Sequence, residues 1–229
     1  MKRLSFLLLP FLLAACSSWP DTVELTDWQF EYNGKWYPAT VPGFIHTGLM
    51  VNGLIPDPYY GTNEDTVQWI GDSIWIYRTY LHYDKLPAGD TLWLVFEGLA
   101  GNAGIWIGNT YPDDTLDGTI IYPENIWNMD NMFCQYEIPI PGAKQMKERF
   151  VYKDSLPILI IFTPLDDTAR EAEYGIPLPD RRAFTRIAPY QQGWDWGPKL
   201  PTCGIWKPVY ITNKSQSELK EPSEKNSFC

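Results

Sequence analysis

The sequence predicts an all-β protein, a jelly-roll-like antiparallel β-sandwich. Three observations favour this class. Aromatic residues make up 15% of the 229 residues, and 20 Pro and 17 Gly interrupt the chain, which is typical of turn-rich β structure. Apolar and polar residues alternate with a period of two in several short segments, as expected of strands with one buried face. No segment has the period of a long amphipathic helix.

Strands are expected where the period-two pattern is bounded by Gly, Pro, Asn or Asp. They are expected at residues 28–32, 75–83, 92–96, 105–107, 132–138, 158–162 and 205–212. One or two helical turns are expected at residues 44–50, directly after Pro42 and Gly43. Roughly seven to nine short strands joined by Pro-rich loops fit a two-sheet sandwich.

Residues 1–15 have the pattern of a cleaved secretory signal. Lys2 and Arg3 precede an apolar run that is too short to span roughly 30 Å of hydrocarbon. The run ends in Leu-Ala-Ala-Cys, which resembles a bacterial lipobox with Cys16 as the lipidated residue; a plain small-residue cleavage site is the alternative. We therefore expect an exported protein that only the lipid holds to the bacterial outer membrane, on its periplasmic or surface side.

The mature chain is expected to form one folded unit, the β-sandwich at residues 20–213. A long Pro-rich loop at 163–180 falls inside it, and loops of this length are often functional. Residues 214–229 are rich in Lys, Ser, Glu and Asn, so we expect a disordered polar tail.

Charge and cysteine spacing exclude several classes of partner. The chain has 18 Lys and Arg against 28 Asp and Glu, and its longest basic run is Arg181-Arg182, so no nucleic-acid partner is expected. None of the four Cys lies at the spacing of a metal site, and no metal or other cofactor is expected. Cys134 and Cys203 could pair in an oxidising compartment; the alternative is a free buried thiol.

The most distinctive stretch is residues 193–198, GWDWGP, in which Trp194 and Trp196 flank Asp195. Sugar recognition uses this chemistry, because an aromatic face stacks on ring C–H groups while a carboxylate accepts hydrogen bonds from hydroxyls. The alternative is a turn whose indole rings plug the end of the sandwich and whose Asp caps its own backbone.

Further stretches, in the same order and at similar spacing, resemble the N-terminal domain of the β-mannosidases of glycoside hydrolase family 2. They are VPGFIHT at 41–47, IPDPYYGTNE at 55–64, VQWI at 67–70, DNMF at 130–133 and GIWKPV at 204–209. The resemblance runs from Trp28 to Thr212. It implies the jelly-roll, galactose-binding-domain-like fold of that family, and β-mannoside glycans as the partner.

The resemblance also implies a site. In the family, the Trp-Asp-Trp loop reaches the active site of a following (β/α)₈ barrel, where its carboxylate binds the non-reducing terminal mannose. That role falls on Asp195, flanked by Trp194 and Trp196, and Arg186 is a further candidate for the same pocket, with a surface ion pair as its alternative. The sequence departs from the family at Gln191-Gln192, where His and an aromatic are more usual.

The chain is not expected to contain the catalytic residues. Retaining glycoside hydrolysis needs two carboxyl groups about 5 to 5.5 Å apart. In the family both are Glu on the barrel, which takes roughly 250 residues, whereas 17 residues follow Thr212 here. Glu64 follows an Asn, as the family's acid/base does, but it falls within the sandwich motif beside Asp65, where an extended backbone would point the two apart.

Three functions are therefore possible. The first is the N-terminal domain of a lipoprotein β-mannosidase, read as a truncated product, that contributes to the sugar pocket of a retaining hydrolase and is inactive alone. The second is a stand-alone carbohydrate-binding lipoprotein without hydrolase activity. A purely structural module would be insensitive to Asp195→Ala.

Overall fold

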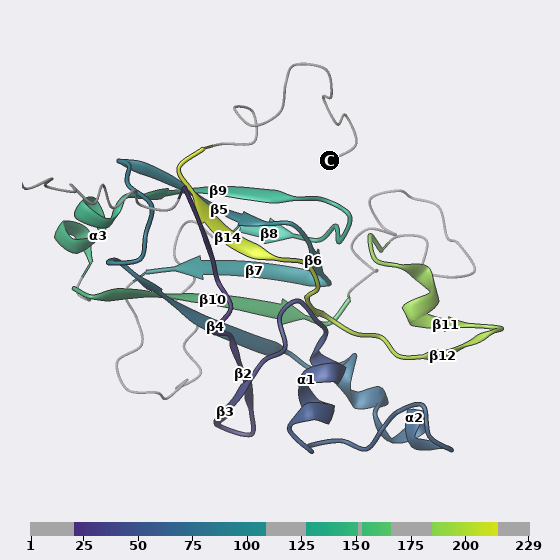
Figure 1. Cartoon of the computed structure of the whole chain (residues 1–229). Coiled ribbons are helices and arrows are strands. Elements are labelled where there is room, and N and C mark those ends of the chain that lie inside the picture. Colours follow the sequence, from purple (N-terminus) through teal and green to yellow (C-terminus); the bar gives the residue numbers. More distant parts are fainter. Residues whose placement is uncertain (1–20, 109–126, 151–152, 166–184, 215–229) are drawn as a thin grey trace, which may run out of the picture.

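The computed structural model describes residues 21–108, 127–150, 153–165 and 185–214. Within them the chain forms two antiparallel sheets that enclose one main hydrophobic core (Figure 1). This confirms the predicted all-β sandwich. The expected leader, Cys16, most of the 163–180 loop and the expected tail beyond Lys214 lie outside the described residues.

The larger sheet has six strands in the order β3-β2-β4-β10-β7-β8. Their bounds are β2 (Gln29–Tyr32), β3 (Lys35–Pro38), β4 (Trp75–His82), β7 (Asn102–Ile107), β8 (Trp127–Met129) and β10 (Ser155–Thr163). The central pair, β4 and β10, runs from Ser155 opposite His82 to Phe162 opposite Trp75. Alternation along these strands directs Tyr77 and Leu81 into the core.

The smaller sheet has four strands in the order β1-β14-β5-β9. Their bounds are β1 (Thr22–Glu24), β5 (Thr91–Phe96), β9 (Tyr136–Pro141) and β14 (Val209–Thr212). Pro139 and Pro141 lie on β9, at the edge of the sheet. Proline is tolerated there because an edge strand can leave one row of backbone groups without ladder partners.

The core fills the space between the two sheets. Phe30, Tyr77 and Phe162 from the larger sheet share it with Leu94 and Ile211 from the smaller one. The Tyr77 ring packs edge-on against Phe162, with their centroids 5.5 Å apart. Each such buried side chain stabilises the fold by about 1.5–3 kcal/mol relative to exposure.

Two predicted strands are placed differently in the structure. The strand expected at 132–138 begins only at Tyr136, because Asn131 starts a turn: its Oδ1 accepts the Phe133 N–H at 3.1 Å and its C=O accepts the Cys134 N–H at 3.3 Å. The strand expected at 205–212 is split into β13 (Gly204–Ile205) and β14, with Pro208 immediately before β14.

The period-two pattern predicted β2 but missed two elements, β3 and α3. β3 pairs with β2 in a hairpin that turns at Asn33 and Gly34, whose φ angles of 52° and 72° are those of a type I′ turn. The short helix α3 (Ala143–Arg149) has Lys147 and Arg149 in its last turn, where positive charge is favourable. The predicted helical turns after Gly43 are confirmed as α1 (Ile45–Val51).

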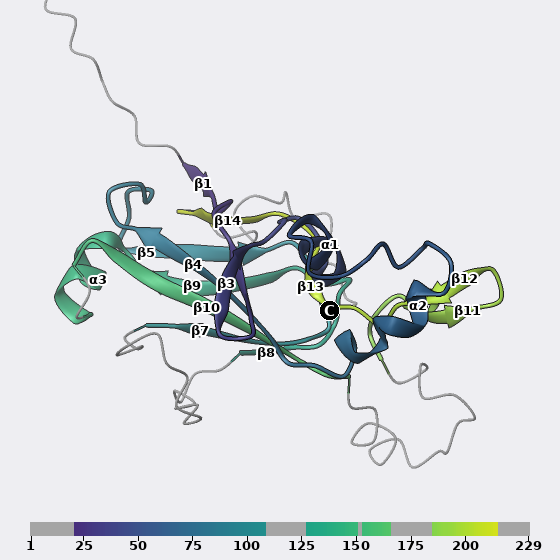
Figure 2. The same cartoon turned by 90° about the horizontal axis from the view of Figure 1, so that it is seen from below.

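The remaining short elements gather at one end of the sandwich, opposite to α3 (Figures 1 and 2). They are α1, α2 (Asn63–Thr66), the 3₁₀ helix η1 (Gln68–Ile70), and a hairpin made of β11 (Gln192–Trp194) and β12 (Gly197–Lys199). No helix in the described ranges is both long and apolar enough to cross a membrane.

Two glycines allow backbone segments to meet at this end. The Gly43 N–H donates to the Ile205 C=O at 2.8 Å, next to the pairing of β13 with β6 (Leu99–Ala100). A Cβ on Gly204 would lie 2.5 Å from the Gly43 oxygen, and Gly204 has a φ of +155°. The motifs at 41–47 and 204–209 are therefore neighbours in space.

Candidate functional site

The sequence-predicted residues Trp194, Asp195 and Trp196 lie together at the tip of the β11–β12 hairpin. Trp194 pairs with Gly197, so Asp195 and Trp196 form the two-residue connection. Trp194 is 48% exposed and Trp196 is 71% exposed. The Asp195 carboxylate is also exposed and accepts no hydrogen bond from the described part of the chain. The indole rings therefore do not plug the sandwich, and Asp195 does not cap its own turn.

The hairpin is held from outside by residues of α2 and η1. The Glu64 Oε1 accepts the backbone N–H of Lys199 at 2.6 Å. The Gln68 Nε2 donates to the Lys199 C=O at 2.8 Å and to the Glu64 C=O at 2.9 Å. These side chains occupy both backbone groups of Lys199, and we call this arrangement the Glu64–Gln68 clamp.

The Glu64 carboxylate has a structural role, because it binds the backbone of the hairpin that presents Asp195. Glu64 and Asp65 lie on a helical turn, α2. The prediction that they lie on an extended backbone is therefore wrong.

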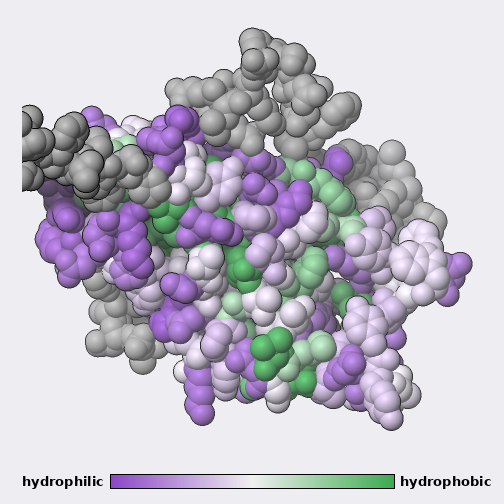
Figure 3. Space-filling view, in the orientation of Figure 1, coloured by the Kyte–Doolittle hydropathy of each residue, from purple (hydrophilic) through white to green (hydrophobic). Residues whose placement is uncertain are grey.

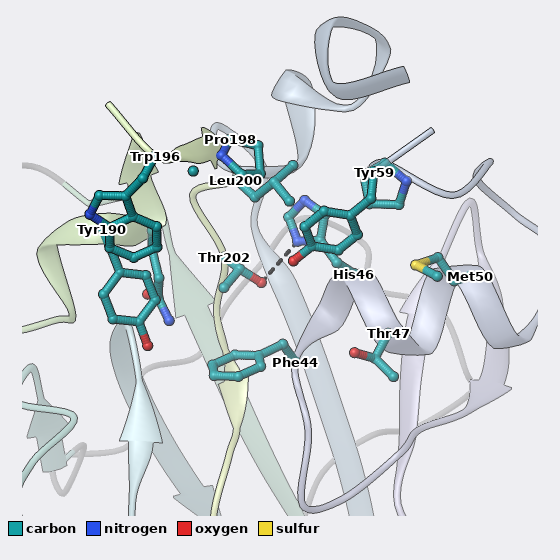
Figure 4. Close-up of a pocket in the computed structure, with 13 residues that line it drawn as sticks. Phe44, His46, Thr47, Met50, Tyr59, Tyr190, Trp196, Pro198, Leu200 and Thr202 are labelled. Atoms are coloured by element: carbon teal, nitrogen blue, oxygen red, sulfur yellow. Dashed lines mark hydrogen bonds between the residues drawn. The ribbon is translucent and has the colours of Figure 1, made fainter. Parts of the chain in front are cut away.

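An open cavity of about 540 Å³ lies between this hairpin and α1 (Figure 4). The hairpin side contributes Tyr190 and Trp196, whose ring centroids are 5.9 Å apart. The opposite side contributes His46 from α1 and Tyr59 from the loop between α1 and α2. Thr202 also lines the cavity, and its Oγ1 is 2.9 Å from the Nδ1 of His46 on α1.

His46 is the one described lining residue whose ordinary pKa is near neutral. Its side chain is only 7% exposed, and desolvation lowers the pKa of His46 from 6.5 to about 4. The imidazole is therefore neutral at physiological pH. Its Nε2 is buried without a hydrogen-bond partner, and so is the Oε1 of Gln191, which is 8% exposed and lines the same cavity. A buried unsatisfied group costs about 1–3 kcal/mol.

Arg186 lies on a separate segment from the hairpin tip. It forms an isolated parallel bridge with Asn131, and its C=O accepts the Met132 N–H at 2.9 Å. Its side chain is exposed and makes no ion pair with Asp195 in the described structure. The structure therefore does not join Arg186 to the Trp-Asp-Trp tip.

Met132 ties several sequence motifs to this region. The Trp206 Nε1–H donates to the Met132 C=O at 3.1 Å, and the Ala188 N–H donates to the Met132 Sδ at 3.0 Å. Met132, Ile187 and Ala188 form a small apolar cluster of their own. Motifs far apart in the sequence thus support the segment that leads into the hairpin.

Cys134 and Cys203 do not form a disulfide with each other. Cys134 is disulfide-bonded and Cys203 is a free thiol, so the predicted alternative of a Cys134–Cys203 pair is wrong. Desolvation raises the pKa of the Cys203 thiol, which keeps it protonated and unreactive. Among the described residues, no group of three or more His, Cys, Asp or Glu could hold a metal ion.

Sequence reasoning did not find the cavity or the clamp. His46 and Glu64 both fall in motifs that the sequence singled out, but their partners Thr202 and Lys199 are more than a hundred residues away along the chain. No local pattern links such pairs. Only the packing of α1, α2 and the hairpin brings them together.

Comparison with known proteins shows a consistent match. Residues 28–207 match the family described as glycosyl hydrolase 2 galactose-binding domain-like. β-Mannosidase B of Emericella nidulans is 31% identical over 198 residues, which are 80% of this chain and 21% of that protein. β-Mannosidase B of Thermothelomyces thermophilus is 32% identical over 193 residues, 81% of this chain and 21% of that protein.

Solved structures agree with these matches. The crystal structure of β-D-mannosidase from Dictyoglomus thermophilum matches with a TM-score of 0.64 and 29% identity, over 84% of this chain and 22% of that one. The exo-chitosanase CsxA of Amycolatopsis orientalis has the same fold, with a TM-score of 0.51 and 17% identity over 84% of this chain and 20% of its own. The chain spans about a fifth of the length of each of these relatives.

Proposed function

Because this chain belongs to the glycosyl hydrolase 2 galactose-binding domain-like family and resembles β-mannosidases over four fifths of its length, we propose that it acts as the N-terminal domain of a β-mannosidase. Such an enzyme removes terminal non-reducing β-D-mannose from glycans. The observation that carries the proposal is the hairpin tip, where Asp195 is flanked in the sequence by the exposed Trp194 and Trp196 and its exposed carboxylate has no hydrogen-bond partner among the described residues.

The role proposed for Asp195 is to hold and orient the sugar. A carboxylate accepts two short hydrogen bonds from neighbouring hydroxyls, and these charge-assisted bonds are about twice as strong as neutral ones. The flat faces of Trp194 and Trp196 offer surface on which ring C–H groups can stack. Orientation of this kind contributes to transition-state binding without any proton transfer by Asp195.

The proposed chemistry is retaining hydrolysis, with both catalytic carboxyl groups on a (β/α)₈ barrel and neither on this chain. The pair must lie about 5 to 5.5 Å apart. Glu64, the one residue here whose sequence context resembles the family acid/base, is bound to the Lys199 backbone. Asp195 would complete a pocket whose reactive groups come from the barrel.

Exposed apolar side chains at the hairpin end support a neighbouring domain there. They are Met50, Val51, Tyr59, Tyr60, Trp194 and Trp196. Figure 3 shows apolar surface gathered over α1, where Met50 and Val51 lie. Gathered exposed apolar side chains mark interaction or ligand sites in soluble proteins.

Calorimetry with mannose tests the assignment of Asp195. We expect the chain to bind mannose weakly and Asp195→Asn to abolish the binding, because the amide carries no charge to strengthen the hydrogen bonds. Asp84→Asn, at another exposed carboxylate, is the matched control and keeps the wild-type affinity. Clear binding that Asp195→Asn leaves unchanged would refute the site.

The same titration separates the sugar-binding functions from the purely structural one. A stand-alone carbohydrate-binding lipoprotein also binds sugar weakly, because the isolated loop supplies only part of a pocket, whereas a purely structural module shows no binding at all. Weak binding that depends on Asp195 supports a hairpin that supplies only part of a pocket.

The proposed location is outside the cytoplasm, with lipid on Cys16 as the anchor. Intact-mass analysis of the mature protein from a bacterial host is expected to show the acyl mass on a new N-terminal Cys16. A mature N-terminus without lipid would rule out the anchor but leave the sugar site untouched.

A further inference from the structure

We propose that the α3 end of the sandwich faces an anionic phospholipid surface, so that the hairpin with Asp195 points away from the membrane. The inference rests on the lipid anchor at Cys16 proposed above. The membrane-facing residues are exposed basic side chains on α3 and just after it, which we call the α3 surface: Lys144, Lys147, Arg149 and Lys153.

The first described residue, Asp21, lies at the α3 end. Its C=O accepts the Asn213 N–H at 3.4 Å, and the Asn213 Nδ2 donates to the Ala88 C=O at 3.4 Å. In the same loop as Ala88, the Asp90 C=O accepts the N–H of Gly142, the residue directly before α3, at 2.9 Å. These hydrogen bonds connect the start of β1 to α3, in the part of the sandwich away from β11 and β12 (Figure 2).

The proposed anchor is too short to let this end move far from the lipid. Asp21 follows Cys16 by five residues, which reach at most about 18 Å when fully extended. The strand β4 alone has eight residues and spans about 26 Å between the hairpin end and the α3 end. The tether therefore holds the α3 end close to the lipid, whereas the hairpin end can stay clear of it.

The α3 surface presents its positive charge at the end of the molecule. Lys147 and Arg149 lie in the last turn of α3, and Lys144 is exposed in its first turn. The Lys153 Nζ donates to the C=O of Lys147 at 2.7 Å and to the C=O of Phe150 at 2.9 Å, so its charge is fixed at the C-terminal end of the helix.

The two ends of the sandwich differ in charge. Residues 144–154 carry four basic and two acidic side chains. The other charged residues near α3 nearly cancel, with Lys85 and Lys214 against Asp21, Asp84 and Asp90. At the hairpin end, segments 52–74 and 189–200 together carry five acidic side chains and one basic one, Lys199. An anionic surface attracts the first end and repels the second.

This orientation suits the proposed sugar site. With the α3 surface on the lipid, Asp195 and the exposed Trp194 and Trp196 face the solution from which a glycan arrives. The reverse orientation would bring the Asp195 carboxylate towards anionic headgroups, which repel it.

Amine labelling of the lipidated full chain tests the orientation. The chain is added to preformed vesicles of phosphatidylcholine alone or of phosphatidylcholine with phosphatidylglycerol, which is anionic. Peptide mapping by mass spectrometry then gives the labelling rate of each lysine. We expect phosphatidylglycerol to slow the labelling of Lys144 and Lys147 severalfold and to leave Lys199, which is exposed on β12, unchanged.

A pair of double variants tests the role of the charges. Lys147→Gln with Arg149→Gln is expected to restore fast labelling of Lys144 on the anionic vesicles. Lys35→Gln with Lys199→Gln is the matched control, because it removes two exposed positive charges away from α3, and it should keep Lys144 protected. Melting temperatures are measured alongside to show that both variants fold. Protection of Lys144 that survives in both would refute the α3 surface as a site for anionic lipid.

The outcomes separate this inference from the proposals on which it rests. A mature chain without lipid on Cys16 would refute both the anchor and the orientation, but not the sugar site at Asp195. If the lipid is present and Lys144 and Lys147 are labelled equally fast on both kinds of vesicle, or if Lys199 is protected instead, the orientation is refuted and the anchor stands.

Discussion

At the scale of single residues, the site is defined by polar groups that the fold leaves without partners. The Asp195 carboxylate is exposed at a hairpin tip, while the His46 Nε2 and the Gln191 Oε1 are buried beside a cavity. Folded proteins satisfy most of their buried polar groups, so the unsatisfied atoms of His46 and Gln191 lower the stability of this end of the sandwich.

The stability of the protein is expected to depend on His46 in acid. Above pH 6.5, the folded and unfolded chains both hold His46 neutral. Between about pH 6.5 and 4, the unfolded chain binds a proton that the folded chain does not, because the pKa of His46 is lowered to about 4 in the folded state. The free energy of unfolding therefore falls as the pH is lowered through this window, by at most about 3 kcal/mol from this group.

Urea unfolding of the wild type, His46→Gln and His82→Gln at a series of pH values measures this effect. The loss of stability in acid should be smaller in His46→Gln, whereas His82→Gln should follow the wild type since His82 is exposed. Identical pH profiles for His46→Gln and the wild type would show that His46 is not buried neutral.

At the scale of elements, the short helices α1 and α2 position the hairpin. α1 buries Ile45 and Leu49 in the main core and forms one wall of the cavity, whereas α2 buries no residue and carries the clamp on Lys199. Their role is to fix the geometry of β11 and β12, whose tip would otherwise be an isolated two-stranded ribbon of marginal stability.

The clamp predicts a difference between two substitutions of Glu64. Glu64→Ala removes the acceptor of the Lys199 N–H and is expected to lower mannose affinity severalfold. Glu64→Gln keeps a carbonyl oxygen at the same place and is expected to stay near the wild type. Asp65→Ala is the neighbouring control, since the Asp65 side chain is exposed and makes no hydrogen bond in the described structure. Equal affinities for all four proteins would show that the clamp does not position the site.

The close approach of two motifs predicts the effect of a glycine substitution. Gly204→Ala places a Cβ 2.5 Å from the Gly43 oxygen at a φ of +155°, so we expect destabilisation of about 1–3 kcal/mol or more. Gly197→Ala is the control, because nothing lies within 4 Å of its Cβ position. Thermal unfolding of both variants checks this, and equal melting temperatures would contradict it.

Most of the sandwich could be predicted from the sequence because its strands bury one face. The alternation in Trp75–His82 and Thr91–Phe96 reflects that burial directly. The β11–β12 hairpin was not predicted as strands, because β11 and β12 have three residues each and lie outside the core. The Trp-Asp-Trp stretch could be singled out by its chemistry, whereas the cavity depends on contacts between Thr202 and His46 that no local pattern contains.

At the scale of the whole molecule, the site lies at one end of the sandwich. The Trp-Asp-Trp tip, the cavity and the exposed apolar side chains of α1 all lie at that end, opposite to α3. This one-sided arrangement is expected of a domain that contributes part of a site to a larger enzyme.

The isolated chain is therefore expected not to hydrolyse an aryl β-mannoside. The assay follows release of the aryl alcohol by the purified chain and by Glu64→Gln, at equal concentration. Activity that survives repurification and is lost in Glu64→Gln would contradict this expectation and show that this chain carries a catalytic carboxyl group.

The most direct test of the central claim is to locate bound mannose on the chain itself. The 11 Trp residues provide indole N–H signals throughout the fold, and these can be recorded by ¹H–¹⁵N NMR as mannose is added. We expect shifts of Trp194 and Trp196 that Asp195→Asn abolishes, with the buried Trp28 and Trp75 unmoved. Shifts elsewhere in the sandwich, or shifts at the hairpin that persist in Asp195→Asn, would contradict it.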